Sequence, residues 1–221
     1  MEIKKLKDVV DESGFKAILI GESGAGKTYS ISTLGGNPLI LSAEKGLLTL
    51  KDLVPDMDVV KLNSMADMRD AIISLRDDTD HDTIIIDSLS DVAEEVLAYE
   101  MTQNSHGMKA YGALADTMIK MVKAFRDLPK NVIFLCKQVD ILDNEGNVTR
   151  EARMPGKKVG PELPYLVDFV FYARSKRGED GNIMRTWQTV DDEIRCGKQR
   201  GGKLADYEEP NWANIFDKVN S

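Results

Sequence analysis

The chain has 221 residues, of which 42% are hydrophobic and 30% are charged, so a water-soluble globular protein with room for one substantial α/β domain is expected. The formal net charge of −8 argues mildly against a nucleic-acid binder, although lysine and arginine gather late in the sequence. No apolar run could span a bilayer, the N-terminus lacks the features of a secretory signal, and the two cysteines, Cys136 and Cys196, have no framework or metal-ligand spacing. A cytoplasmic location is therefore expected.

The first two-thirds of the chain alternate short apolar runs with amphipathic segments. Apolar runs bounded by turn residues are typical of buried strands, whereas apolar residues three and four positions apart indicate helices with one buried face. The predicted strands are residues 15–21, 38–43, 59–62, 83–87 and 131–136. The predicted helices are residues 27–34, 65–75, 91–102 and 114–128. This alternation predicts a mostly parallel sheet with helices on both faces.

The last third has a different pattern. Residues 137–163 are polar and contain glycine and proline, which indicates a working loop or a hairpin. Strands are predicted at 167–173 and 184–190, with a turn at 178–182, so antiparallel strands are expected at one edge of the sheet. The whole chain, 1–221, is interpreted as a single domain with an extension at 1–14 and a packing tail at 205–221, where Trp212 and Phe216 are expected to join the core.

The segment GESGAGKT, residues 21–28, matches the pattern G-x-x-x-x-G-K-[ST] in full. It lies between a predicted strand and a predicted helix, which favours a phosphate-binding loop over an ordinary glycine-rich turn. Its glycines let successive backbone N–H groups point at phosphate oxygens, the lysine ammonium reaches the β- and γ-phosphates, and the threonine hydroxyl is a ligand for Mg²⁺. The residues expected to hold the nucleotide are Gly21, Glu22, Ser23, Gly24, Ala25, Gly26, Lys27, Thr28 and Tyr29.

A carboxylate closes the strand predicted at 83–87. At the carboxyl end of a buried strand beside the phosphate loop, Asp87 is placed to bind Mg²⁺ together with Thr28. A helix follows, so a cap for that helix is the other role to consider, and Asp87, Ser88 or Ser90 could supply it.

Two further polar residues follow predicted strands. Glu44 lies just past the second strand, at the edge where open α/β sheets bind ligands, and is expected to polarise the attacking water, with Glu22 as the alternative. Gln138 opens the long loop, where its amide would hydrogen-bond a γ-phosphate oxygen and lose that bond after cleavage. Both residues could instead be ordinary surface side chains.

These segments, in this order, resemble the ATPase core of the bacterial RecA recombinase and are most like the short, phage-type RecA-core proteins associated with single-strand annealing. The resemblance runs from about residue 15 to residue 204 and includes LSAEKGL at 41–47, IIIDSLSDV at 84–92 and FLCKQVD at 134–140. It implies a RecA-like P-loop NTPase fold, a three-layer sandwich, with ATP and Mg²⁺ as cofactors. It also implies catalytic roles for Glu44, Lys27 and Gln138.

Two segments resemble the DNA-binding loops of that family. Residues 105–125 are similar to the first loop with the helix after it, and residues 139–159 correspond to the second, although its DNEGN turn is more like a hairpin tip. The residues that the resemblance offers to single-stranded DNA are Lys109, Tyr111, Arg150, Arg153, Lys157 and Lys158. Tyr111 would be a stacking platform for bases, or else a loop aromatic that packs locally.

A late segment, GKQRGG at 197–202, has the position at which RecA places two lysines that reach the ATP site of a neighbouring subunit. The resemblance therefore implies that Lys198 and Arg200 act in trans, within a homo-oligomeric ring or filament that shares ATP sites. Scattered surface cations are the other interpretation.

The function expected is that of a DNA-stimulated ATPase acting on single-stranded DNA in phage-type recombination or annealing, in the host cytoplasm if the chain is phage-encoded. The acidic net charge favours an alternative, a P-loop ATPase whose nucleotide state gates docking of a replication helicase or a single-strand-binding protein. A small-molecule kinase is disfavoured because the sequence has no arginine-rich lid or second acceptor-binding motif.

Overall fold

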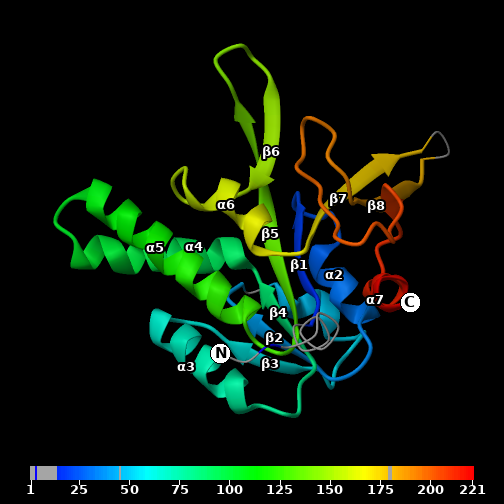
Figure 1. Ribbon diagram of the computed structural model, residues 1–221, viewed down its shortest axis with the longest axis horizontal. Coiled ribbons are helices and arrows are strands. Elements are labelled where there is room, and N and C mark those ends of the chain that lie inside the picture. The colour runs from blue at the N-terminus through cyan, green and yellow to red at the C-terminus, as the bar shows by residue number, and fades with distance from the viewer. Residues whose placement is uncertain (1–2, 4–13, 45, 179–180) are drawn as a thin grey trace.

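A mixed β-sheet forms the centre of the structure (Figure 1), a computed structural model that describes residue 3 and residues 14–44, 46–178 and 181–221. Within these residues the sheet has nine strands in the order β3-β2-β4-β5-β1-β7-β8-β9, with β6 paired to β5. The strands are β1 (Lys16–Gly21), β2 (Pro38–Ser42), β3 (Asp58–Lys61), β4 (Thr83–Asp87), β5 (Asn131–Leu142), β6 (Val148–Ala152), β7 (Phe169–Arg177), β8 (Ile183–Gln188) and β9 (Tyr207–Glu208). The predicted extension at 1–14 lies outside the described residues, except for residues 3 and 14.

The strands from β3 to β7 in that order run parallel, and β8 and β9 add antiparallel strands beyond β7. The mostly parallel sheet with late antiparallel strands is therefore confirmed. Parallel strands place all their carboxyl ends at one edge, and the segments that follow β1, β2, β4 and β5 meet there.

Helices cover both faces of the sheet, which makes three layers (Figure 1). The helices are α2 (Lys27–Ser30), α3 (Met65–Asp77), α4 (Leu89–Gln103), α5 (Gly107–Arg126), α6 (Val159–Leu166) and α7 (Trp212–Asn220), with 3-10 turns η1 (Ile31–Thr33) and η2 (Leu47–Leu50). One core packs α3 to α6 against the sheet, and the other packs η1, η2 and α7 against its opposite face. Strand β4 shows why its run of β-branched residues is needed: Ile84 and Ile86 enter the first core and Ile85 enters the second.

The polar segment after residue 136 is a hairpin that rises from the sheet (Figure 1). Strand β5 continues to Leu142 and pairs with the antiparallel β6, from Gln138 opposite Ala152 to Leu142 opposite Val148. The described helices are all too short or too polar to span a lipid bilayer.

Several sequence expectations need correction. Helix α5 begins at Gly107 instead of 114, so Lys109 and Tyr111 belong to a helix and not to a loop. The helix predicted at 27–34 is α-helical only to Ser30 and continues as a 3-10 turn. His81 is mostly buried, and its ring lies 3.1 Å from a carboxylate oxygen on each of two aspartates, Asp58 and Asp78.

The tail packs into the core as expected. Trp212 is fully buried on α7, and Phe216 on the same helix packs beside it. The predicted turn at 178–182 includes residues 179 and 180, which lie outside the described part of the chain.

Candidate functional site

The loop after β1 has a backbone that few residues other than glycine adopt. Gly24 and Gly26 have φ angles of 75° and 89°, in the left-handed region. A Cβ on Gly24 would meet no heavy atom within 4 Å, and one on Gly26 would meet only the side chain of Arg185. The loop is therefore open at Gly24 and faces only an arginine side chain at Gly26, which leaves room for phosphates.

Lys27 and Thr28 follow the glycines at the start of α2. The Lys27 ammonium donates hydrogen bonds to the carbonyl oxygens of Gly21 and Glu22, both at 2.9 Å, so the lysine is held over its own loop. Burial lowers the pKa of Lys27, and the nearby Asp87 carboxylate opposes that shift. The Thr28 hydroxyl donates to Asp87 Oδ2 at 2.9 Å. A hydroxyl and a carboxylate in contact provide two of the hard oxygen ligands that suit Mg²⁺, so these residues fit the metal.

Asp87 is buried at the carboxyl end of β4, two strands from the phosphate loop. Burial raises the pKa of Asp87 to about 6; the Thr28 hydrogen bond opposes the shift and the Glu44 charge adds to it. A carboxyl that is costly to ionise in isolation gains from a cation beside it. Ser88, and not Asp87, caps α4 through the backbone N–H of Asp91, so the carboxylate is not used by the helix.

Glu44 follows β2 at the same edge. Its backbone N–H donates to the carbonyl oxygen of Asp87 at 3.3 Å, while Ser42 Oγ donates to the Glu44 carbonyl at 2.7 Å. The side chain is exposed, and its charge acts on Asp87, Lys27 and Lys137. The structure therefore places Glu44 at the same sheet edge as Lys27 and Asp87.

Gln138 lies on β5, one residue past the pair formed by Lys137 and Gly21. Its amide Nε2 is 3.4 Å from Glu22 Oε1 in the phosphate loop and 3.1 Å from Asp140 Oδ1. The amide thus touches both the loop and the hairpin. Glu22, the alternative water-polarising residue, is exposed and takes part in this contact.

A cavity of about 330 Å³ opens beside the phosphate loop and contains positive charge that the sequence does not predict there. Loop residues 22–25 and Gln138 line one side of it. The other side is formed by β7, β8 and the segment after β8, and includes Arg174, Arg185 and Arg195. The sequence does contain one signal for Arg185. Side chains alternate along a strand, so Arg185, two positions before the buried Trp187, lies on the same face of β8.

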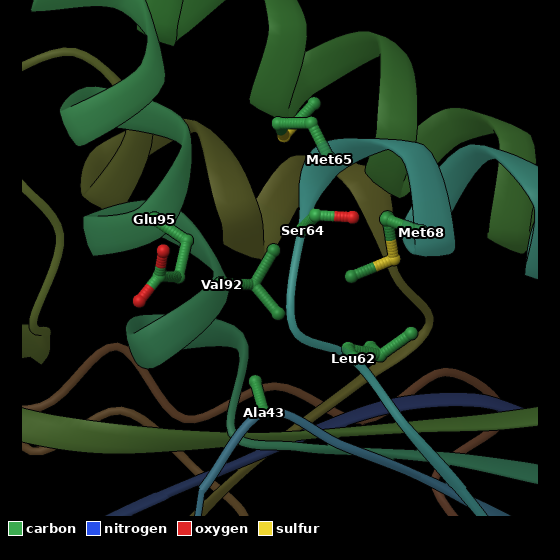
Figure 2. Close-up of a pocket in the computed structure, with 7 residues that line it drawn as sticks. All are labelled: Ala43, Leu62, Ser64, Met65, Met68, Val92 and Glu95. Atoms are coloured by element: carbon green, nitrogen blue, oxygen red, sulfur yellow. The ribbon is translucent and has the colours of Figure 1, made fainter.

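A second, much smaller cleft lies between α3 and α4 (Figure 2). Ala43, Leu62, Ser64, Met65, Met68, Val92 and Glu95 line it. Its volume of about 10 Å³ is close to that of a single water, and the Glu95 carboxylate points away from the apolar side chains in Figure 2. This cleft is a packing gap, although it adjoins Glu44 through Ala43.

Lys198 and Arg200 both have partners in their own chain. The Lys198 ammonium donates to the carbonyl oxygens of Pro164 and Val167, both at 2.8 Å. Arg200 lies 2.6 Å from Asp168 Oδ1 and is largely exposed. Neither residue lines the cavity beside the phosphate loop.

The six DNA-binding candidates fall into two groups. On the hairpin, Arg150 pairs with Asp140 at 3.1 Å, and beyond it Arg153 pairs with Glu94 at 3.5 Å. The others, Lys109, Tyr111, Lys157 and Lys158, are exposed. The ring of Tyr111 lies against Gly156, where an added Cβ would be 3.1 Å from Tyr111 Cδ1. The two segments that resemble DNA-binding loops therefore meet at this tyrosine.

Comparison with known proteins gives one finding. The sequence matches the model of a protein family described as an AAA domain over residues 13–201, which is most of the chain and includes the phosphate loop, Asp87, Glu44 and Gln138. No curated protein matches it.

Proposed function

The chain belongs to the AAA-domain family of P-loop ATPases, and from this premise we propose that it hydrolyses ATP to control its hold on single-stranded DNA. The role would be that of the short RecA-core proteins of phage recombination and annealing. The observation that carries the DNA part is the contact between Tyr111 and Gly156, which joins an exposed aromatic ring to a segment with the exposed Lys157 and Lys158. A ring for base stacking beside cations for phosphates is what sequence-independent single-strand binding requires.

The groups at the sheet edge would carry out the hydrolysis. Lys27 would leave the loop carbonyls and meet the phosphate charge, and Glu44 would orient a water for in-line attack on the γ-phosphate. Mg²⁺ bound through Thr28 and Asp87 would supply charge neutralisation at the phosphates. The Glu44 backbone N–H donates to the Asp87 carbonyl oxygen, which would keep the proposed water-orienting residue close to the proposed metal-binding residue.

Gln138 would connect the nucleotide to the DNA side. Its amide contacts Glu22 of the loop and Asp140 of the hairpin, and Asp140 pairs with Arg150 across the two strands. A γ-phosphate that accepts a hydrogen bond from Gln138 would compete with both carboxylates. The hairpin would then respond to the presence of that phosphate, as segment switches in other nucleotide-binding proteins do.

The test is ATP turnover measured with and without single-stranded DNA over a salt series. We expect stimulation that weakens steeply as salt rises, because phosphate contacts release counterions. Tyr111→Ala should remove most of the stimulation while leaving the basal rate unchanged, and Tyr99→Ala, which removes an exposed tyrosine from α4, is the matched control. Absence of both stimulation and DNA retention at low salt would exclude a DNA substrate.

A second function is favoured by a separate observation. The hairpin exposes Ile141 and Leu142 beside its acidic tip, and Leu142 is 69% exposed. An apolar and acidic hairpin suits a protein partner better than a nucleic acid, in keeping with the net charge of −8. Docking of a single-strand-binding protein or a helicase, gated by nucleotide, would then replace DNA binding. In this case Leu142→Asp should abolish capture of the purified partner and leave ATP turnover without DNA unchanged.

A further inference from the structure

Arg185 lies over the phosphate loop of its own chain. A Cβ placed on Gly26 would be 3.4 Å from Cδ of Arg185 and 3.7 Å from its Nε. Register explains this approach: Arg185 is opposite Ser175 on β7, and β7 pairs with β1, whose last residue, Gly21, begins the loop. The guanidinium therefore lies on the side of the loop where Gly26 has no side chain.

Within the described part of the chain, the other two arginines of the cavity are already paired, whereas Arg185 is not. Arg174 donates to Gln188 Oε1 at 2.9 Å and to the Tyr207 hydroxyl at 3.0 Å, and Arg195 pairs with Asp192 at 3.0 Å. Arg185 forms no hydrogen bond or ion pair with any other described residue. Because its side chain is also exposed, the guanidinium is able to rotate toward a ligand at little cost.

The charge at the sheet edge explains why a phosphate ligand would need a further cation such as Arg185. Glu22, Glu44 and Asp87 place three carboxylates at this edge, and the cations whose charges are coupled to Glu44 or Asp87 are Lys27 and Lys137. Lys137 is held in an ion pair with Asp91. A polyphosphate placed here would need further positive charge, and a planar guanidinium can give a phosphate two parallel N–H donors.

We propose that Arg185 binds the nucleotide phosphates held above Gly26 and acts in cis. This rests on the proposed nucleotide site at residues 21–28. The arginine would thus contact the substrate directly, and the positive charge that the resemblance assigned to a neighbouring subunit would come, at least in part, from β8 of the same chain. Lys198 and Arg200, the residues proposed to act between subunits, do not supply this cation within one chain. Lys198 contacts two backbone carbonyl oxygens and Arg200 contacts Asp168.

Affinity for a fluorescent N-methylanthraniloyl derivative of ATP, titrated with Mg²⁺ present, gives the first test. Arg185→Ala should weaken binding by about ten-fold or more, as loss of a charge-assisted hydrogen bond predicts. Arg185→Lys should recover part of this loss. Lys176→Ala is the matched control, because Lys176 is an exposed cation on β7 that does not line the cavity, and its affinity should equal that of the parent. Thermal unfolding of each variant checks that the fold is intact.

Subunit mixing decides between cis and trans. Lys27→Ala keeps Arg185 but loses its own phosphate-loop lysine, and Arg185→Ala keeps the loop. If Arg185 acts in cis, the mixture has no more ATP turnover than the sum of the two variants. Recovery of turnover in the mixture would overturn the cis assignment. Parent-like affinity of a folded Arg185→Ala would overturn the inference alone, whereas failure of the parent chain to bind the nucleotide would instead overturn the proposed site.

Discussion

Lys27 contacts two carbonyl oxygens of its own loop, so its charge is already directed to the place where phosphates would lie. Lys27→Ala removes that charge, and we expect affinity for Mg·ATP to fall by about a hundred-fold, because a hydrogen bond to a charged group is lost in a partly buried site. Calorimetric titration measures the affinity. Thermal unfolding should change little. Parent-like affinity of the alanine variant would contradict the assignment of the whole phosphate site.

Glu44 gives a second prediction at the scale of one side chain. Glu44→Gln keeps the size of the side chain but loses the charge that polarises water, so kcat should fall by about a hundred-fold or more while the affinity for ATP stays within about two-fold. Steady-state turnover and nucleotide titration measure the two quantities.

The matched control for Glu44 is Glu95→Gln. Glu95 is an exposed carboxylate on α4, and Figure 2 shows it at the cleft that adjoins Ala43. Its substitution should leave kcat unchanged. An equal loss in both variants would mean that general electrostatics near the sheet edge, and not a specific water contact, is responsible.

The site residues differ in how far the sequence could identify them. The phosphate loop is one contiguous segment, and Asp87 and Gln138 follow apolar runs, so the sequence placed them at the same sheet edge. Arg185 could not be found in this way, because its approach to Gly26 joins residues far apart in the chain and depends on the register of β7 and β8. The hydrogen-bond partners of Lys198 could not be predicted from the sequence either, because they are backbone carbonyl oxygens of another segment.

Strands that are buried on both faces can be predicted from the sequence, because they contain a continuous run of apolar residues. Strand β4 was predicted with its observed bounds, Thr83–Asp87. Helix α5 was predicted to start too late because Gly107 and Gly112 lower helix propensity in its first turns, and packing of Ala110 in the interior compensates. The end of β5 was missed because it leaves the sheet and pairs only with β6, so its residues are not continuously apolar.

Helix α7 is connected to the phosphate loop through hydrogen bonds. The Trp212 indole donates to Ser30 Oγ at 3.1 Å, and Ser30 Oγ donates to the Lys27 carbonyl at 2.6 Å. Trp212 is fully buried, so Trp212→Ala should lower the free energy of unfolding by about 3–5 kcal/mol. Trp212→Phe keeps most of the ring but removes the donor, and should cost about 1–3 kcal/mol. Urea unfolding measures both; a Trp212→Phe variant as stable as the parent would show that the hydrogen bond contributes nothing.

His81 joins the start of β3 to the segment before β4. Burial of its ring lowers the pKa, but hydrogen bonds to Asp58 and Asp78 outweigh burial and raise the pKa of His81 above 6.5. Protonated His81 therefore stabilises the fold fully below pH 6.5, and this stabilisation is lost as pH rises through the raised pKa. We expect the free energy of unfolding to fall by about 0.5–1 kcal/mol between pH ~5.5 and ~8. His81→Asn should abolish this pH dependence in unfolding curves. An unchanged pH profile in the variant would assign the dependence to other groups.

At the scale of the whole molecule, the sheet order explains how distant segments form one site. The carboxyl ends of β2, β4, β5 and β1 are consecutive along one edge, so Glu44, Asp87, Gln138 and the phosphate loop converge there. The net charge of −8 describes the molecule as a whole and does not describe this edge, where Lys27 and Lys137 lie near the Glu44 and Asp87 carboxylates and three arginines line the adjoining cavity. Composition alone therefore says little about what the site binds.

Substitutions of Lys198 and Arg200 test whether chains assemble with shared ATP sites, and we expect the two residues to behave differently. Lys198 is held by two carbonyls of its own chain, so Lys198→Ala should lower the free energy of unfolding by about 1–3 kcal/mol, and turnover should fall only as far as the folded fraction falls. Arg200 is exposed, so Arg200→Ala should change stability by less than about 1 kcal/mol.

Turnover per chain, measured over a wide range of protein concentration, separates the two roles. If Arg200 completes a neighbour's site, the parent's turnover per chain rises with concentration as chains associate, and Arg200→Ala loses that rise without losing affinity for ATP. We expect Arg200, and not Lys198, to behave in this way, because leaving Asp168 at the surface costs less than leaving two carbonyl groups without a donor. A Lys198→Ala variant with parent-like stability and a lowered kcat would reverse that expectation and make the lysine the residue that acts between chains.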